Sequence, residues 1–451
     1  MSLERKDGAT KVAALVEWCL IVSGLLVAVA TLSPSVGGDG AVRFETVARM
    51  LNSGGGFSKF SLIQPLLSLP LAWLALAFEA RPVVYVAYFN FLIFSVLSVP
   101  CYLELARRYS PGVGRKWLLL MLGASMFPHH WQNYYGEVLS ALCLFAGALW
   151  VERRPLPAAL LLAIGCINTP ALLLPMIALA VTWFVMRKKV APSIAVVLAL
   201  VVIVAEMWFK GILDGQGYFS DSEHGFQTVL PYSGLPGFSY PVSLGVLSIV
   251  LSFGKGLVFY IPALMLLASR RVRSHLLLEK GATAIVLVAL LSPILLYAKW
   301  WAWYGGSFWG PRFFLFLCPP ACLIMAVCLQ QRWPPARLAF LAVIVSLSGW
   351  VAVNGFTFGQ AQMDACWAEN YAREYLCWYV PEFSALWRPF VTGQLWHVLS
   401  DPRGAYAMWD VVAVCYLIWV AIRNSRGLRV HRGHRLAAAA SIRRKGDSTP
   451  S

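Results

Sequence analysis

Long apolar segments, separated by short clusters of lysine and arginine, run through most of this chain. The first is 12–32, VAALVEWCLIVSGLLVAVATL. Of the 451 residues, 59% are hydrophobic and only 13% are charged, so the chain cannot bury its apolar surface in a water-soluble core. Segments of this length match the thickness of a bilayer. The sequence therefore predicts an all-α, polytopic membrane protein.

The basic clusters set the expected orientation of the spans, because cytoplasmic loops are enriched in lysine and arginine. Arg5, Lys6 and Lys11 precede the first apolar segment, so we expect a cytoplasmic N-terminus. Following the clusters along the chain predicts about twelve transmembrane helices with both termini inside. The net charge of +16 comes from these clusters and a basic tail, and no nucleic-acid partner is expected.

One apolar segment, 60–78, is expected to lie in the outer interface of the membrane. It contains Pro65 and Pro70 and has no basic residue after it until Arg81. Counting it as a span would place the next basic cluster outside. That cluster is Arg107, Arg108, Arg115 and Lys116. We therefore expect interfacial helices in the first outer loop, formed by this segment and the amphipathic stretch before it.

Three parts of the chain are distinguished by composition. Residues 1–330 form the expected transmembrane catalytic module. Residues 331–424 add transmembrane helices and an outer loop, 354–406. Residues 425–451 are rich in arginine, alanine and serine, and we expect a disordered cytoplasmic tail that contacts anionic membrane lipids.

The first outer loop, 37–59, concentrates charge in a region that is otherwise almost free of it. Its sequence is GGDGAVRFETVARMLNSGGGFSK. A carboxylate such as Asp39 can take a proton, and Arg43 and Lys59 can hold a phosphate. The structural alternative for Asp39 is a cap for a helix over 41–51. The two roles are compatible, so this loop is the expected centre of the chemistry.

An aromatic segment, 297–312, reads YAKWWAWYGGSFWGPR. Its rings suit an ordinary interfacial belt, but the belt leaves Lys299 and Arg312 unexplained. Flat ring faces at Trp301 and Tyr304 suit a sugar or a prenyl chain, and the guanidinium of Arg312 suits a phosphate. The segment is therefore a second candidate site on the outer face.

Two further segments carry candidate residues. In 128–137, PHHWQNYYGE, the adjacent histidines point in different directions on a helix, which argues against a metal site. Acceptor or sugar binding by His130 and an ordinary capping or interfacial-belt role both stay open. Glu137 begins the next apolar segment, where an acid is costly unless it has a function. Lys255, between two glycines, is placed to reach a lipid phosphate or to snorkel to the interface.

Cys366 and Cys377 are the two cysteines in a polar stretch, and the other eight lie singly in apolar segments. The expected topology puts this stretch outside the cytoplasm, where disulfides form and persist. We therefore expect a disulfide between them.

Three runs carry a family resemblance: DGAVRFETVARML…GFSKFSLIQPLLSLP, GFSYP…SFGKGLVFYIP and YAKWWAWYGGSFWGPRFF. Together they resemble the GT-C superfamily of membrane glycosyltransferases, in particular bacterial relatives of the protein mannosyltransferases and of the lipid A aminoarabinose transferase. The similarity covers roughly residues 12 to 330. It implies a bacterial cytoplasmic (inner) membrane protein with its active site on the periplasmic or extracellular face. The implied donor is a polyprenyl-phosphate-linked sugar, and the acceptor is a glycan, a lipid or a protein.

The resemblance also implies roles for single residues. Asp39 looks like the catalytic aspartate of the family's first loop, and Glu137 like a second acid. Lys59, Arg312, Arg43 and Lys255 are the expected ligands of the donor phosphate. Many relatives carry another acid directly after the loop aspartate, but Gly40 stands there. We therefore expect no obligatory metal, with a divalent ion left open.

Polyprenyl phosphate is a leaving group of low basicity, so one base and cations on the departing phosphate should suffice. Attack opposite the phosphate inverts the anomeric centre. Two other classes stay open: a lipid-linked oligosaccharide ligase or polymerase, which the arginines of 354–406 suit, and a lipid or sugar transporter, which the helix break at 168–170 suits.

Overall fold

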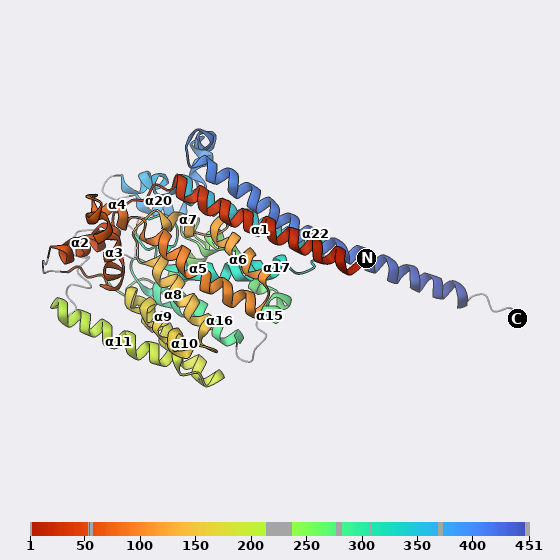
Figure 1. Ribbon diagram of the computed structural model, residues 1–451, viewed down its shortest axis with the longest axis horizontal. Helices are drawn as coiled ribbons and strands as arrows, with labels where there is room; N and C mark the ends of the chain where they lie inside the picture. Colours follow the sequence, from red (N-terminus) through yellow and green to blue (C-terminus); the bar gives the residue numbers. More distant parts are fainter. Residues whose placement is uncertain are drawn as a thin grey trace.

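The computed structural model describes residues 2–52, 54, 57–212, 237–276, 282–306, 308–368 and 373–446. In these residues all regular structure is helical, apart from one isolated bridge between Ser35 and Asn133. Figure 1 shows the helices gathered in one bundle, with α2, α3 and α4 at one end. The predicted all-α class agrees with this architecture.

The helices of the first half are bounded as follows: α1 Ser2–Thr31, α2 Asp39–Leu51, α3 Ile63–Ala77, α4 Pro82–Val86, α5 Phe89–Arg108, α6 Pro111–Gly123, α7 Phe127–Trp131, α8 Glu137–Trp150, α9 Pro155–Asn168, η1 Pro170–Leu172, α10 Leu173–Arg187 and α11 Ala191–Lys210. Those of the second half are α13 Val242–Leu251, α14 Leu257–Tyr260, η3 Pro262–Ala268, α15 Arg270–Leu276, α16 Ala282–Lys299, η4 Arg312–Leu317, α17 Cys318–Leu329, α18 Pro335–Val353, η5 Asn354–Phe358, η6 Gly359–Met363, α19 Asp364–Trp367, α20 Glu374–Tyr379, η7 Pro381–Phe383, α21 Arg388–Val391, η8 Gln394–Ser400 and α22 Gly404–Gly446.

Seven helical segments among the described residues are long and apolar enough to cross a membrane. They are Lys11–Thr31, Pro82–Arg108, Pro170–Arg187, Ala191–Lys210, Arg312–Leu329, Pro335–Trp367 and Gly404–Ser425. Five apolar helices are shorter: Ile63–Ala77, Glu137–Trp150, Pro155–Asn168, Val242–Leu251 and Ile285–Lys299. The seven segments are fewer than the roughly twelve spans predicted, so that number and the interfacial position of α3 stay predictions.

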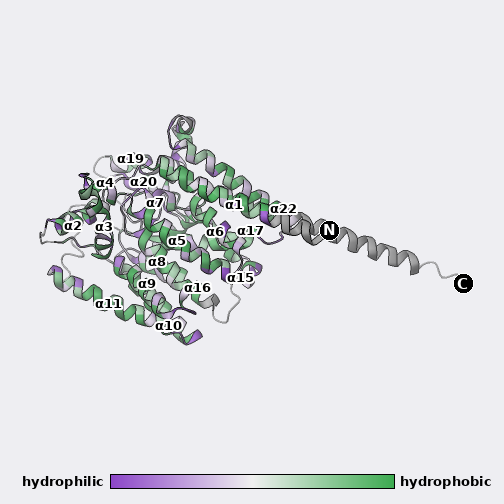
Figure 2. Cartoon of the chain, viewed as in Figure 1, coloured by the Kyte–Doolittle hydropathy of each residue, from purple (hydrophilic) through white to green (hydrophobic). Residues whose placement is uncertain are grey.

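Figure 2 shows that α1, α10 and α11 consist mostly of hydrophobic residues. Many of their large apolar side chains are exposed on the surface of the bundle. On α11 the exposed ones are Ile194, Val197, Leu200, Val201, Val204, Trp208 and Phe209. A water-soluble protein rarely exposes so continuous an apolar face. The outward faces therefore fit contact with lipid.

The first and last long helices pack side by side (Figure 1). The indole Nε1 of Trp409 donates to the carbonyl of Leu20 at 3.0 Å, and a Cβ on Gly24 would lie only 2.2 Å from that indole. Helix α22 continues to Gly446, although disorder was expected from residue 425. The alanine run 437–440 favours a helix, which the expectation underweighted.

A buried ion cluster ties α1 to α6. Glu17 is 1% exposed and lies 2.6 Å from Nε of Arg115 and 2.5 Å from Nζ of Lys116. Tyr416 of α22 also donates to Glu17. The sequence interpretation placed Arg115 and Lys116 among the charges of a cytoplasmic loop. In the structure they instead belong to a helix and are buried by their shared carboxylate.

We predict that Glu17→Gln lowers the free energy of unfolding by about 3–5 kcal/mol, because two buried cations lose their counter-charge. Unfolding in detergent micelles, followed by circular dichroism, measures this change. The matched control is Glu45→Gln, which breaks an exposed pair with Arg49 and should cost less than about 1 kcal/mol. Equal losses in the two variants would contradict the prediction.

Candidate active site

Three charged residues from distant segments meet at the end of the bundle where α2 begins. Arg312 lies with its Nη2 2.7 Å from Oδ2 of Asp39 and its Nη1 3.6 Å from Oε1 of Glu137. Asp39 and Glu137 are the first residues of α2 and α8, where helix dipoles favour negative charge. The structure therefore brings together one candidate from each of three separate sequence segments.

Asp39 begins α2 but does not cap it. The N-cap is Gly38, at φ 52, and no side chain caps the helix. A Cβ on Gly38 would lie 2.9 Å from the ring of Phe308, so the bend requires glycine. The Asp39 carboxylate is 33% exposed and points to Arg312. The capping alternative considered for Asp39 is therefore not what the structure shows.

Gly40 explains why a second acid is missing from this loop. A Cβ at this position would lie 3.2 Å from the carbonyl oxygen of Tyr134. That carbonyl belongs to a loop braced by Gln64 and Asn90, which donate to Tyr135 and its neighbours. The backbone cannot yield easily there, so a larger acidic side chain in place of Gly40 would be strained.

The guanidinium of Arg312 is held on all sides. Its Nε donates to the carbonyl of Gly305 at 2.6 Å, and its Cζ lies 4.1 Å from the ring centroid of Phe308. Gly305 has φ 77, a value that favours glycine. The residues just before Arg312 thus fold back over it, which leaves the arginine 6% exposed.

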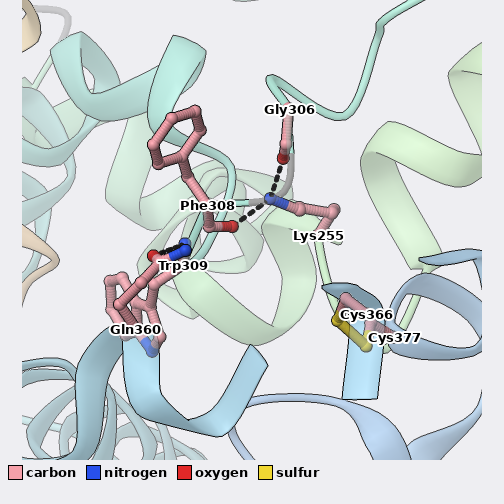
Figure 3. The surroundings of a disulfide bond; sticks show 7 residues. All are labelled: Lys255, Gly306, Phe308, Trp309, Gln360, Cys366 and Cys377. Atoms are coloured by element: carbon pink, nitrogen blue, oxygen red, sulfur yellow. Dashed lines mark hydrogen bonds between the residues drawn. A yellow bond between two sulfur atoms is a disulfide. The ribbon is translucent and has the colours of Figure 1, made fainter. Parts of the chain in front are cut away.

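Lys255 has a different role from the one predicted. Its Nζ donates to the carbonyls of Gly306, Phe308 and Gly310, at 3.1 Å for Gly306 and 3.0 Å for Gly310. Figure 3 shows the ammonium pointing into this loop. An ammonium has three donors, and each already has an acceptor. Lys255 is therefore a brace for the loop that precedes Arg312 and is not placed to bind a phosphate.

Arg43 and Lys59 complete a cationic face beside Asp39. Arg43 is one turn after Asp39 on α2; its Cζ lies 4.5 Å from the ring centroid of Phe60, and Nζ of Lys59 lies 5.8 Å from the same centroid. Nη1 of Arg43 lies 3.5 Å from Oδ1 of Asn168. Its buried Nε has no hydrogen-bond partner among the described residues. Three cations thus gather beside the two carboxylates, an arrangement that can receive an anionic group.

The electrostatics of Asp39 follow from these neighbours. Burial raises the pKa of the Asp39 carboxyl, but the charge and hydrogen bond of Arg312, followed by the charges of Arg43 and Lys59, outweigh it. The pKa therefore lies below its usual value, and the group is ionised at neutral pH. Burial lowers the pKa of Arg43, against the attraction of Glu137 and Asp39.

The remaining predicted residues are not part of this cluster. His130 is 1% exposed, and burial lowers its pKa well below the usual value. Tyr304 stacks on Trp378 with ring centroids 3.8 Å apart and donates to Glu374. Trp301 hydrogen-bonds through its backbone to Gly237. These side chains pack against the protein itself, so sugar binding by them stays a prediction.

Sequence analysis missed several residues that build the site. Asn168, treated only as a helix break, accepts from Arg43 and donates to the carbonyl of Gly136 at 2.8 Å. Glu206 and Lys210, at the end of α11, bind the segment that follows Lys59. These residues could have been found from the sequence, because each is a polar side chain inside an apolar segment. Burying such a side chain costs free energy unless it has a partner.

The structure joins Cys366 of α19 and Cys377 of α20 by a disulfide (Figure 3). The neighbouring Trp378 accepts a hydrogen bond at its carbonyl from the backbone N–H of Gly254, at 2.9 Å. This places the outer loop 354–406 against the Lys255 brace. The disulfide thus supports the same loop that carries Arg312.

We predict that the protein migrates faster on a non-reducing gel than after reduction, because the disulfide closes a loop in the denatured chain. Cys377→Ser should abolish the difference. Cys415→Ser, which removes a free cysteine, is the control and should keep it. A shift that survives Cys377→Ser would contradict the Cys366–Cys377 pairing.

No protein-family model, curated protein or solved structure matches this chain. Its function is therefore inferred from the site's own chemistry.

Proposed function

We propose that this chain is an integral membrane glycosyltransferase of the GT-C type. It would move a sugar from a polyprenyl-phosphate donor to an acceptor hydroxyl on a glycan, lipid or protein. The observation that carries the proposal is the contact of Asp39 with Arg312 beside Arg43 and Lys59. One partly exposed carboxylate beside three cations at the end of apolar helices suits this chemistry.

The reaction divides between the two kinds of charge. The acceptor oxygen bonds to the anomeric carbon as the bond from that carbon to the phosphate oxygen breaks. The acceptor's proton passes to Asp39, and the bonding electrons leave with the polyprenyl phosphate. Arg312, Arg43 and Lys59 would stabilise the phosphate as its charge grows. Attack from the face opposite the phosphate inverts the anomeric configuration.

The pairing of Asp39 with Arg312 suggests how the base is activated. Paired with a guanidinium, Asp39 is a weak base, because its pKa lies below the usual value. A donor phosphate would compete for the same guanidinium N–H groups. Withdrawing Arg312 from Asp39 would raise the carboxylate's basicity, so donor binding would prepare the base for the acceptor.

The membrane arrangement belongs to the same proposal. About twelve spans, interfacial α2 and α3, and cytoplasmic termini would put the charged cluster on the outer face of a bacterial inner membrane. The 1–330 part would be the catalytic module, and 354–406 would cover the site. The disulfide in that loop is compatible with an outer location.

We predict that membranes containing the protein transfer labelled sugar from a polyprenyl-monophosphate donor with inversion. Asp39→Asn should lower kcat/KM by about 10²–10⁴-fold, the range for loss of a general base. Lys59→Ala should chiefly raise KM for the donor. Glu45→Gln, on the exposed face of α2, is the matched control and should transfer normally.

Normal transfer by Asp39→Asn would remove Asp39 as the base. Transfer from pyrophosphate donors alone would favour the ligase or polymerase. Retention of the anomeric configuration would contradict direct displacement. Absence of transfer with every lipid-linked donor, together with uptake of a solute into vesicles, would favour the transporter.

We predict that two pH profiles of the enzyme differ at their acid limbs. In the free enzyme Arg312 keeps the pKa of Asp39 below its ordinary value of 3.8, so kcat/KM should hold until the pH falls below about 4. In the donor complex Arg312 is shared with phosphate, so the acid limb of kcat should lie at higher pH. The opposite order would contradict competition for Arg312.

A further inference from the structure

A buried ion pair lies at the C-terminal end of α11. Lys210 is its last residue, and Glu206 lies one turn earlier; their side chains are 1% and 13% exposed, with Nζ 3.5 Å from Oε2. Charges at the end of an apolar helix normally reach out toward water. A buried pair gives little net stability by itself, so its other contacts indicate what it is for.

Among the described residues, those contacts go to the residues that follow Lys59. Nζ of Lys210 donates to the carbonyl of Phe60 at 2.5 Å. Glu206 accepts from the hydroxyl of Ser61 at 3.1 Å and from the backbone N–H of Leu62 at 3.3 Å. The pair therefore fixes three consecutive residues, through the carbonyl of Phe60, the hydroxyl of Ser61 and the N–H of Leu62.

The same short segment carries part of the charged site. The ring of Phe60 lies under Arg43, and Lys59 precedes it. From the other side α2 holds the segment through Thr46 and Ser58, whose hydroxyls are 3.1 Å apart. A serine and three glycines, 53–56, join it to α2 in the sequence.

We propose that Glu206 and Lys210 are positioning residues that hold Lys59 and Phe60 in place for an anionic ligand. The pair acts as a clamp between the membrane helix α11 and the end of the first outer loop. Phe209 adds to the clamp, because its ring stacks on Phe57 with centroids 5.6 Å apart. The identity of the ligand as a donor phosphate rests on the proposed function, but the clamp itself does not.

Limited trypsin digestion of the protein in detergent tests the clamp without any activity. Cleavage after Lys59 should accelerate about tenfold in Glu206→Gln and in Lys210→Met. Each variant loses about one hydrogen bond that holds the segment, so the free energy of local opening decreases by a corresponding amount. Cleavage after Arg49, which lies before the glycines, is the internal reference. Since the pair acts as a unit, the double variant should open no more than the more affected single variant.

Glu152→Gln is the matched control. Glu152 binds Arg187 and Lys189 at 3.2 and 2.9 Å, before the opposite end of α11, and its loss should leave cleavage after Lys59 unchanged. If either charged variant fails to fold, Phe209→Ala removes the stacking on Phe57 without stranding a charge and should still accelerate cleavage. Unchanged cleavage in every clamp variant would overturn the proposal.

Kinetics then separate this inference from the proposed function. Loss of the clamp should raise KM for a polyprenyl-phosphate sugar several-fold with a smaller change in kcat, whereas mere loss of folded protein lowers the rate without changing KM. Faster cleavage with no sugar transfer by any form, wild type included, would leave the clamp standing and reject the glycosyltransferase. Transfer with unchanged KM and unchanged cleavage would reject the clamp alone.

Discussion

The Arg312 guanidinium is the point on which the charged site depends. A buried cation is tolerated only when its charge and its N–H groups are matched, and here Asp39, Glu137 and the carbonyl of Gly305 supply the match. The two carboxylates reach it because each begins a helix. The placement of α2 and α8 is thus coupled to one side chain, although their sequences lie almost a hundred residues apart.

Arg312 is in turn held in place by residues to which no step of the proposed reaction is assigned. Lys255 donates hydrogen bonds to three carbonyls of the loop before Arg312. The disulfide-bonded segment accepts a hydrogen bond from Gly254, which is next to Lys255. Asn168 likewise accepts a hydrogen bond from Arg43. The Glu206–Lys210 clamp binds the backbone of Phe60, directly after Lys59. Each uses a polar group inside apolar surroundings, where hydrogen bonds are strong and unmet ones costly. Rigidity of this kind favours pre-organised electrostatic catalysis.

Sequence alone predicted what charge pattern and segment length determine. The helical class follows from the apolar segments, and the grouping of Asp39, Lys59, Arg312 and Glu137 follows from charges that are expensive in an apolar chain. Partner choice does not follow from that argument. Lys255 was expected to bind a phosphate, but the structure pairs it with backbone carbonyls. The sequence does not specify which acceptor a single lysine will find, and the glycines beside it allow close approach of the backbone in either case. Arg115 and Lys116 were likewise predicted to be charges of a cytoplasmic loop. In the structure both form ion pairs with Glu17, which lies on a helix distant in the sequence.

A purely structural role for the Asp39–Arg312 pair explains less than a catalytic one. Burying an ion pair gives little net stability, because the loss of solvation offsets the attraction between the charges. Asp39 remains a third exposed while its arginine is buried, and Nε of Arg43 next to it is buried without a partner in the described part of the chain. A carboxylate that is a third exposed and a buried N–H without a partner among the described residues are compatible with the proposed catalytic site, in which Asp39 takes the proton of an acceptor hydroxyl and the cations bind an anionic group.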